Sequence, residues 1–201
     1  MKVEIRDDVV VIDGYVNAVE RESKVLTDHW GQKFIEKIKA GTFARALDRA
    51  KALQTPVKVL LNHDYSRELT STSDLTTELK EDNIGLRAHV EIRDAEVVEK
   101  AKNKRLVGWS FGFHILRQKV DDEDIQHRDV QELELKEVSI LDDTKIPAYD
   151  GTSIEMRDTD TVLYEVRSTD GLEYVERSTE EAAEVVDNHE YENRYLATFI
   201  Q

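Results

Sequence analysis

The stretch VGWSFGFHIL, Val107–Leu116, gathers three of the seven Trp and Phe residues of the chain around one serine, Ser110. Side chains of a β-strand alternate between its two faces. With this period the large apolar side chains share one face: Trp109, Phe111, Phe113 and Ile115. The other face presents the Ser110 hydroxyl beside Gly112. We therefore predict a strand whose aromatic face packs on the core and supports the serine from behind.

Two interpretations of Ser110 follow from this placement. A nucleophile needs a rigid support and an open side, and Gly112 would leave space for a substrate above that face. The more ordinary interpretation, which this stretch alone favours, is a small residue on a half-buried strand. Because a serine hydroxyl is a poor nucleophile without a base, the choice depends on the rest of the chain.

Six histidines are candidates for that base. The best single candidate is His63, because it follows the alternating apolar strand of PVKVLLNHD, residues 56–64, where the chain turns. The end of a strand is a rigid place from which a side chain can enter a site. The other histidines, among them His89 on the polar side of a predicted hairpin, are better explained as exposed or satisfied side chains.

A carboxylate falls on an apolar face in QELELKEVSIL, residues 131–141. Alternation places Glu137 in register with leucines, whereas Glu132 and Glu134 lie on the opposite, solvated face. Burying a carboxylate is costly unless it is paired. Two partners stay open at this point: an imidazole N–H, which the carboxylate would orient, or one of the many arginines.

The rest of the chain indicates an α+β fold that is dominated by strands. Further strands are expected in four segments: residues 3–19, 57–61, 129–141 and a hairpin over 74–92. Helices are expected in three: residues 29–41, 42–53 with Thr42 as N-cap, and 94–106 with Asp94 as N-cap. The predicted architecture is a mostly antiparallel sheet or barrel with about three surrounding helices.

Composition excludes several classes of function. The 201 residues carry a net charge of −15 and no cysteine, so a thiol nucleophile and a disulfide framework are excluded. An acidic surface repels phosphate, which disfavours a nucleic-acid partner. No metal-binding motif, phosphate-binding loop, signal peptide or membrane span is found. We expect a soluble protein of a cytoplasm-like compartment that needs neither metal nor cofactor.

The segment from Gly151 onwards differs from the rest of the chain. Residues 151–201 contain 13 acidic and 4 basic residues and no lysine. We expect a hairpin that turns at Asp170–Gly171, followed by a helix from the capping box at Ser178; a mobile acidic tail is the alternative. The predicted organisation is therefore a main domain over 1–150 and an acidic C-terminal extension over 151–201.

Three motifs, taken in order, resemble one known family. The motifs are LLNHD (60–64), GWSFGF (108–113) and LELKEVSIL…IPAY (133–149). Together they resemble the prohead, or procapsid maturation, serine proteases of tailed bacteriophages, whose fold is similar to that of the herpesvirus assembly proteases. The resemblance covers roughly residues 14–149. It implies a herpesvirus-protease-like fold and a protease domain over 1–150.

The resemblance also implies roles for residues. His63 matches the family's histidine, Ser110 its nucleophile and Glu137 its acidic residue, so a Ser-His-Glu serine endopeptidase is expected. The implied substrates and partners are the scaffolding protein, the amino-terminal segment of the major capsid protein and the protease itself, inside the assembling procapsid in the host cytoplasm. No nucleic-acid or membrane partner is expected, and a homo-oligomer is left open. The acidic extension would be a docking or self-processing segment.

Departures from the family pattern keep other functions open. The chain has VGWSFGF where the family often has SGMSFGF, and DDTK before IPAY where an apolar stretch is usual. These differences concern the substrate pocket and the oxyanion hole more than the three matched residues. One alternative is a non-catalytic capsid-assembly or scaffold protein that kept the fold. An esterase or amidase for small substrates ranks last, because the GxSxG elbow is missing.

Overall fold

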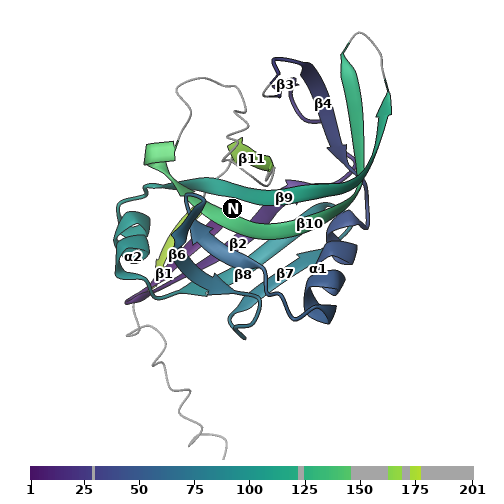
Figure 1. Ribbon diagram of the computed structural model, residues 1–201. Coiled ribbons are helices and arrows are strands. Elements are labelled where there is room, and N and C mark those ends of the chain that lie inside the picture. The colour runs from purple at the N-terminus through teal and green to yellow at the C-terminus, as the bar shows by residue number, and fades with distance from the viewer. Residues whose placement is uncertain (29, 122–124, 146–162, 169–172, 178–201) are drawn as a thin grey trace, which may run out of the picture.

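The computed structural model describes residues 1–28, 30–121, 125–145, 163–168 and 173–177, and its elements are arranged as two sheets with helices at either end (Figure 1). Within these residues the protein is a strand-rich α+β fold with two α-helices. Neither sheet closes into a barrel over the described residues. The strand-rich α+β class is therefore confirmed, but the barrel and the third helix are not found there.

The first sheet joins the N-terminal strands to the predicted hairpin. Its strand order is β12-β1-β2-β8-β7. The strands span Lys2–Arg6 (β1), Val9–Ala18 (β2), Thr77–Glu81 (β7), Gly85–Ile92 (β8) and Glu173–Arg177 (β12). The hairpin of β7 and β8 is confirmed. Its first strand begins at Thr77 and not at residue 74, and Leu75 is fully exposed in the preceding turn.

The second sheet contains the stretch around Ser110. Its strand order is β11-β9-β10-β4-β3, and β5 joins it by pairing with both β10 and β6. The strands span Leu26–Thr27 (β3), Lys33–Ile38 (β4), Lys58–Leu61 (β5), Asp64–Ser71 (β6), Leu106–Asp121 (β9), Gln126–Asp142 (β10) and Leu163–Ser168 (β11). One strand, β10, runs parallel to β4 along its first part and parallel to β5 along its last part. One edge of β10 therefore pairs with β4 and then β5, and its other edge pairs with β9.

The two helices lie where two of the three were predicted. They are α1 (Thr42–Ala52) and α2 (Ala95–Lys102), and a 3₁₀ turn covers Asp143–Lys145. Asp94 caps α2 as expected, because its carboxylate accepts from the Val97 N–H at 3.1 Å. Thr42 does not cap α1. Gly41, in the left-handed region at φ 80°, occupies the N-cap position, and the Thr42 hydroxyl instead donates to the carbonyl oxygen of Gln131 at 3.1 Å.

The helix expected over residues 29–41 is wrong. This segment contains β4, in which Phe34, Glu36 and Ile38 are buried in strict alternation. The period of two fits a strand that pairs with β10, whose first residues run parallel to it in register with Phe34–Ile38. A partner about 90 residues away in the chain therefore determines the conformation of this segment.

The hairpin expected in the C-terminal extension is also wrong. Both strands exist, but β11 pairs antiparallel with β9 and β12 pairs parallel with β1, so they belong to different sheets. The Tyr174 hydroxyl fixes β12 by donating to the carbonyl oxygen of Leu106 at 2.6 Å. The helix predicted from Ser178 lies outside the described residues.

The aromatic face of β9 is confirmed as part of the core. Trp109, Phe111 and Phe113 are at most 1% exposed. The Phe111 ring meets Phe43 of α1 edge-on at 5.5 Å between centroids and stacks on Phe113 at 5.0 Å. The surrounding core cluster draws buried side chains from both sheets and both helices. β9 is thereby fixed from one side, which leaves Ser110 on the other.

Candidate active site

A sharp turn after β5 determines where the imidazole of His63 points. Asn62 and His63 both adopt left-handed backbone conformations, with φ of 55° and 60°, which are uncommon for residues other than glycine. Two hydrogen bonds to β10 hold the turn: the Asn62 N–H donates to the Ile140 carbonyl oxygen at 2.9 Å, and the His63 N–H donates to Ser139 Oγ at 3.1 Å. Such strain persists only when its surroundings fix it, and here β10 does so.

The carboxylate of Glu137 meets this imidazole. Glu137 is fully buried on β10, beside β5. Its Oε1 lies 2.8 Å from His63 Nδ1, and its Oε2 accepts from Ser139 Oγ at 2.5 Å. Of the two partners that the sequence left open for this carboxylate, the structure contains the imidazole. Both carboxylate oxygens are satisfied, as a buried carboxylate requires.

Ser110 lies on the same face as Glu137, across the pair of β9 and β10. Ser110 is directly opposite Ser139, and Gly112 is directly opposite Glu137. Directly opposed side chains of an antiparallel pair stand on one face, with Cβ atoms about 4.5–5.5 Å apart. The register therefore brings the serine, the carboxylate and, through the β5 turn, the histidine to one face of the second sheet.

The open side expected for Ser110 is absent from this conformation. Ser110 is 0% exposed, and the His63 side chain retains 17% exposure. The turn that carries His63 covers the Ser139 end of the shared face, and β9 is flanked by β10 on one edge and β11 on the other. A substrate would need one of these neighbours to move.

Ser139 is the residue that sequence reasoning missed. Its fully buried hydroxyl accepts from the His63 backbone and donates to the Glu137 carboxylate. Alternation places it on the same face as Glu137, two positions further on. A serine among buried leucines needs a hydrogen-bond partner, and this requirement was the available signal. The hydroxyl bridges the backbone of one candidate site residue to the side chain of another.

A second buried network supports the turn from the side of α2. The Asp142 N–H donates to Asn62 Oδ1 at 3.1 Å, and the Asp142 carboxylate, 1% exposed, lies 2.8 Å from Lys100 Nζ. Burial raises the pKa of this carboxyl, but hydrogen bonds from Lys100, Thr144 and Asn62 outweigh it and hold the pKa well below its usual range. The Lys100–Asp142 pair thus fixes the end of β10 against which Asn62 docks.

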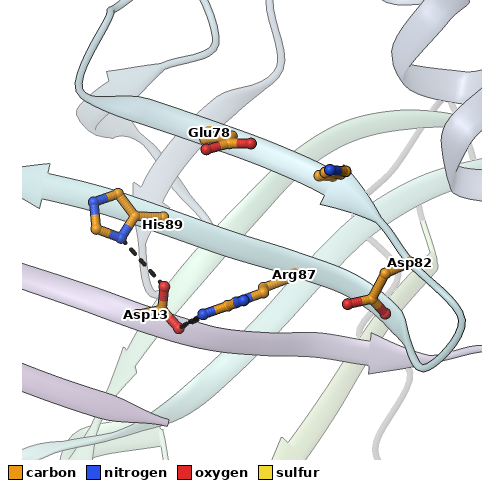
Figure 2. Close-up of a pocket in the computed structure, with 6 residues that line it drawn as sticks. Asp13, Glu78, Asp82, Arg87 and His89 are labelled. Atoms are coloured by element: carbon orange, nitrogen blue, oxygen red, sulfur yellow. Dashed lines mark hydrogen bonds and ion pairs between the residues drawn. The ribbon is translucent and has the colours of Figure 1, made fainter.

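Two other histidines, His89 and His114, have carboxylate neighbours of their own. His89, predicted to be exposed, lines a polar pocket on the first sheet (Figure 2), where its Nδ1 is 3.2 Å from Asp13 Oδ2 and its side chain is 44% exposed. Arg87 donates to the other oxygen of Asp13 at 2.7 Å. His114 lies on β9, 3.6 Å from Glu134. Each of these imidazoles therefore has one nitrogen beside a carboxylate other than that of Glu137.

The described residues contain neither a cluster of metal ligands nor a membrane-spanning helix. No group of three or more histidine, aspartate or glutamate side chains in these ranges is placed to hold a metal ion. No helix in the same part of the chain is long and apolar enough to cross a membrane.

A comparison with family models identifies the family of the chain. The model described as caudovirus prohead serine protease matches residues 1–165 of the 201. The chain belongs to this family. The resemblance that the sequence motifs suggested is thereby confirmed, and the match extends beyond both ends of the resembling stretch. Comparisons with curated proteins and with solved structures gave no match.

Membership in the prohead protease family gives the general activity. Caudoviruses are tailed bacteriophages, and the family is one of serine peptidases, which are hydrolases, active in capsid maturation. It implies association with capsid and scaffold proteins, and action inside the procapsid within the host cell.

Proposed function

We propose that this prohead protease is an endopeptidase in which Ser110 is the nucleophile, His63 the general base and Glu137 the residue that orients the base. The observation that carries this assignment is the 2.8 Å contact between His63 Nδ1 and the buried Glu137 carboxylate, on the face that holds Ser110. A nucleophile, a base and a third group that orients the base form the general pattern of such sites. The three motifs of the family resemblance select the same residues.

In the proposed mechanism His63 moves one proton twice. With Nδ1–H donating to Glu137, the basic nitrogen of the imidazole is Nε2. Nε2 takes the hydroxyl proton while Ser110 Oγ forms a bond to the peptide carbonyl carbon. The same proton then passes to the leaving amine as the C–N bond breaks. Water hydrolyses the resulting ester by the same sequence, releasing the carboxylic acid and restoring Ser110.

The proposed substrates are the scaffolding protein, amino-terminal segments of the major capsid protein and the protease chain itself. The support for them is membership in the prohead protease family. The acylation and deacylation steps need no cofactor. The proposed division of the chain is a protease domain over 1–150 and an extension over 151–201, two strands of which, β11 and β12, dock on the sheets of the domain.

Active-site labelling tests the assignment directly. A fluorophosphonate probe should label the wild-type chain at Ser110, and His63→Ala should lose at least about 1,000-fold in labelling rate, the scale seen when a triad member is removed. Ser110→Ala should abolish labelling and scaffold cleavage, while Ser73→Ala, at an exposed serine on a turn, should leave both unchanged. Labelling that persists in Ser110→Ala would contradict the proposal.

The second candidate function is a non-catalytic assembly protein that kept the protease fold. The observation in its favour is the complete burial of Ser110. In that case neither labelling nor hydrolysis should occur with the wild-type chain, even when scaffolding and capsid proteins are present. The same experiment therefore separates the two candidates.

A further inference from the structure

The strand that carries Ser110 has a neighbour on each edge. β10, which holds Glu137, pairs with one edge of β9. β11 pairs with the other edge over six residues, from Leu163 opposite Phe113 to Ser168 opposite Gly108. Val166 stands directly opposite Ser110 in this register. Figure 1 shows β11 beside β9, at the end of the sheet away from β4.

An extended peptide binds a sheet most simply by adding a strand to an edge. Backbone hydrogen bonds then supply the affinity, and the alternating side chains supply the specificity. The β10 edge of β9 is part of the site itself, because it brings Glu137 and Ser139 to the face of Ser110. A peptide presented to Ser110 in this way must therefore use the edge that β11 occupies.

We propose that the β11 edge of β9 is the binding edge for extended peptide substrates, and that residues 163–168 occupy it as an intramolecular competitor. This inference rests on the proposed function of Ser110. The protein is then self-blocked in the conformation described here, and a substrate segment binds only when β11 leaves. The complete burial of Ser110 agrees with a site whose binding edge is filled.

The chain keeps this competitor close to its binding edge. Downstream of β11, β12 pairs with β1 over five residues, and Tyr174 is anchored on the Leu106 carbonyl oxygen at the start of β9. A tethered segment competes at the high effective concentration that its linker sets. Release of β11 does not require release of β12, since the two strands belong to different sheets. β11 can therefore leave the edge of β9 and return to it while β12 stays paired with β1.

A binding experiment tests the proposal independently of catalysis. A fluorescently labelled peptide with the sequence of residues 162–169 is titrated into full-length Ser110→Ala, with and without the added substitutions Glu165→Pro and Val166→Pro. Alternate residues of an antiparallel strand turn their N–H groups to the partner, so two consecutive prolines remove at least one ladder hydrogen bond. The proline chain should bind the peptide about tenfold more tightly, as expected if the edge is otherwise open about a tenth of the time.

Two matched controls separate strand release from other effects. Glu165→Thr with Val166→Thr keeps the backbone N–H groups and the strand propensity, and should leave peptide affinity at its parent value. A peptide with prolines at the same two positions should bind neither chain. Equal affinity of the unmodified peptide for the proline chain and its parent would overturn the proposal.

A second measurement keeps the test decisive if the proline chain fails to fold. The unmodified peptide, added to the wild-type chain, should slow fluorophosphonate labelling of Ser110 in proportion to its occupancy, and the proline peptide should not. Labelling that depends on Ser110 but is unaffected by the unmodified peptide would overturn the inference and leave the proposed function intact. Absence of labelling in every folded variant would instead contradict the proposed function, while the binding titration would still decide whether β11 and the peptide share an edge.

Discussion

The imidazole of His63 and the carboxylate of Glu137 meet at 2.8 Å, with the carboxylate fully buried and the imidazole at the surface of the site. The two residues are 74 positions apart in the chain. Glu137 lies on β10, and His63 lies in the turn after β5, which pairs parallel with β10. A carboxylate enclosed in this way has one available role toward its neighbour, which is to accept a hydrogen bond and fix the ring. The relationship leads to the first prediction.

Glu137→Gln should leave the fold intact and remove most of the activity. The amide has nearly the same volume as the carboxylate, but its NH₂ group can donate to Nδ1 and stabilise the wrong tautomer of His63. A comparable change in a Ser-His-Asp triad costs about 10⁴ in kcat. Scaffold-peptide hydrolysis should therefore fall about 10³- to 10⁴-fold with a melting temperature close to that of the wild type. A loss of less than about tenfold would show that Glu137 does not orient the base.

Ser139→Ala should weaken both stability and turnover. The substitution leaves the His63 N–H and one oxygen of Glu137 without the partner they have in the buried site, which costs about 1–3 kcal/mol per unsatisfied group. Because the substitution removes a hydrogen bond that holds His63 and another that holds Glu137, kcat should fall while KM changes little. Ser139→Thr restores a hydroxyl and should recover part of kcat. Urea unfolding and steady-state kinetics of the two variants check this, and equal kcat values for alanine and threonine would contradict a positioning role.

Asp142 should make stability depend on pH in the acid range. Its folded pKa lies well below the unfolded value of about 3.9, so the unfolded state binds more protons as the pH falls. The stabilisation is therefore complete well above pH 4 and decreases as the pH falls below it. Asp142→Asn should show a smaller loss of unfolding free energy between pH 6 and pH 3 than the wild type, as measured by urea denaturation at each pH. If the unfolding free energy of the two proteins depended on pH in the same way, Asp142 would not be the source of the acid dependence.

Phe111→Ala should destabilise the protein strongly without touching the proposed chemistry directly. The ring is fully buried and packs on Phe43 and Phe113, and a Phe→Ala change in a core costs about 3–5 kcal/mol. Trp30→Ala, at an 80% exposed position, should change the unfolding free energy by less than about 0.5 kcal/mol. Chemical denaturation of both variants is the measurement. A small effect at Phe111 would show that the aromatic face does not anchor β9.

The alternation of apolar residues was enough to predict the strand of Ser110 and the burial of Glu137, because alternation is a property of a single strand. It did not suffice for residues 29–41, where the apolar residues also fit a helical spacing and pairing with β10 decides the outcome. The turn signal at Asp170–Gly171 similarly suggested a hairpin, but β11 pairs with β9 and β12 pairs with β1, which belong to different sheets. The contact of His63 with Ser139 depends on the same long-range information, so the role of Ser139 could not be predicted from the sequence.

The spacing of the polar residues on β10 limits where members of the family can gain or lose residues. Glu137, Ser139 and Asp142 all lie on its last part, after a register shift between Leu135 and Glu137. Deleting Val138, between Glu137 and Ser139, would place these two side chains on opposite faces, since a strand has a period of two. Insertions beyond the far end of the β9–β10 ribbon would leave this part in place. Natural changes in length should therefore accumulate at the distal end of the ribbon, and the last third of β10 should keep a constant spacing among its three polar residues.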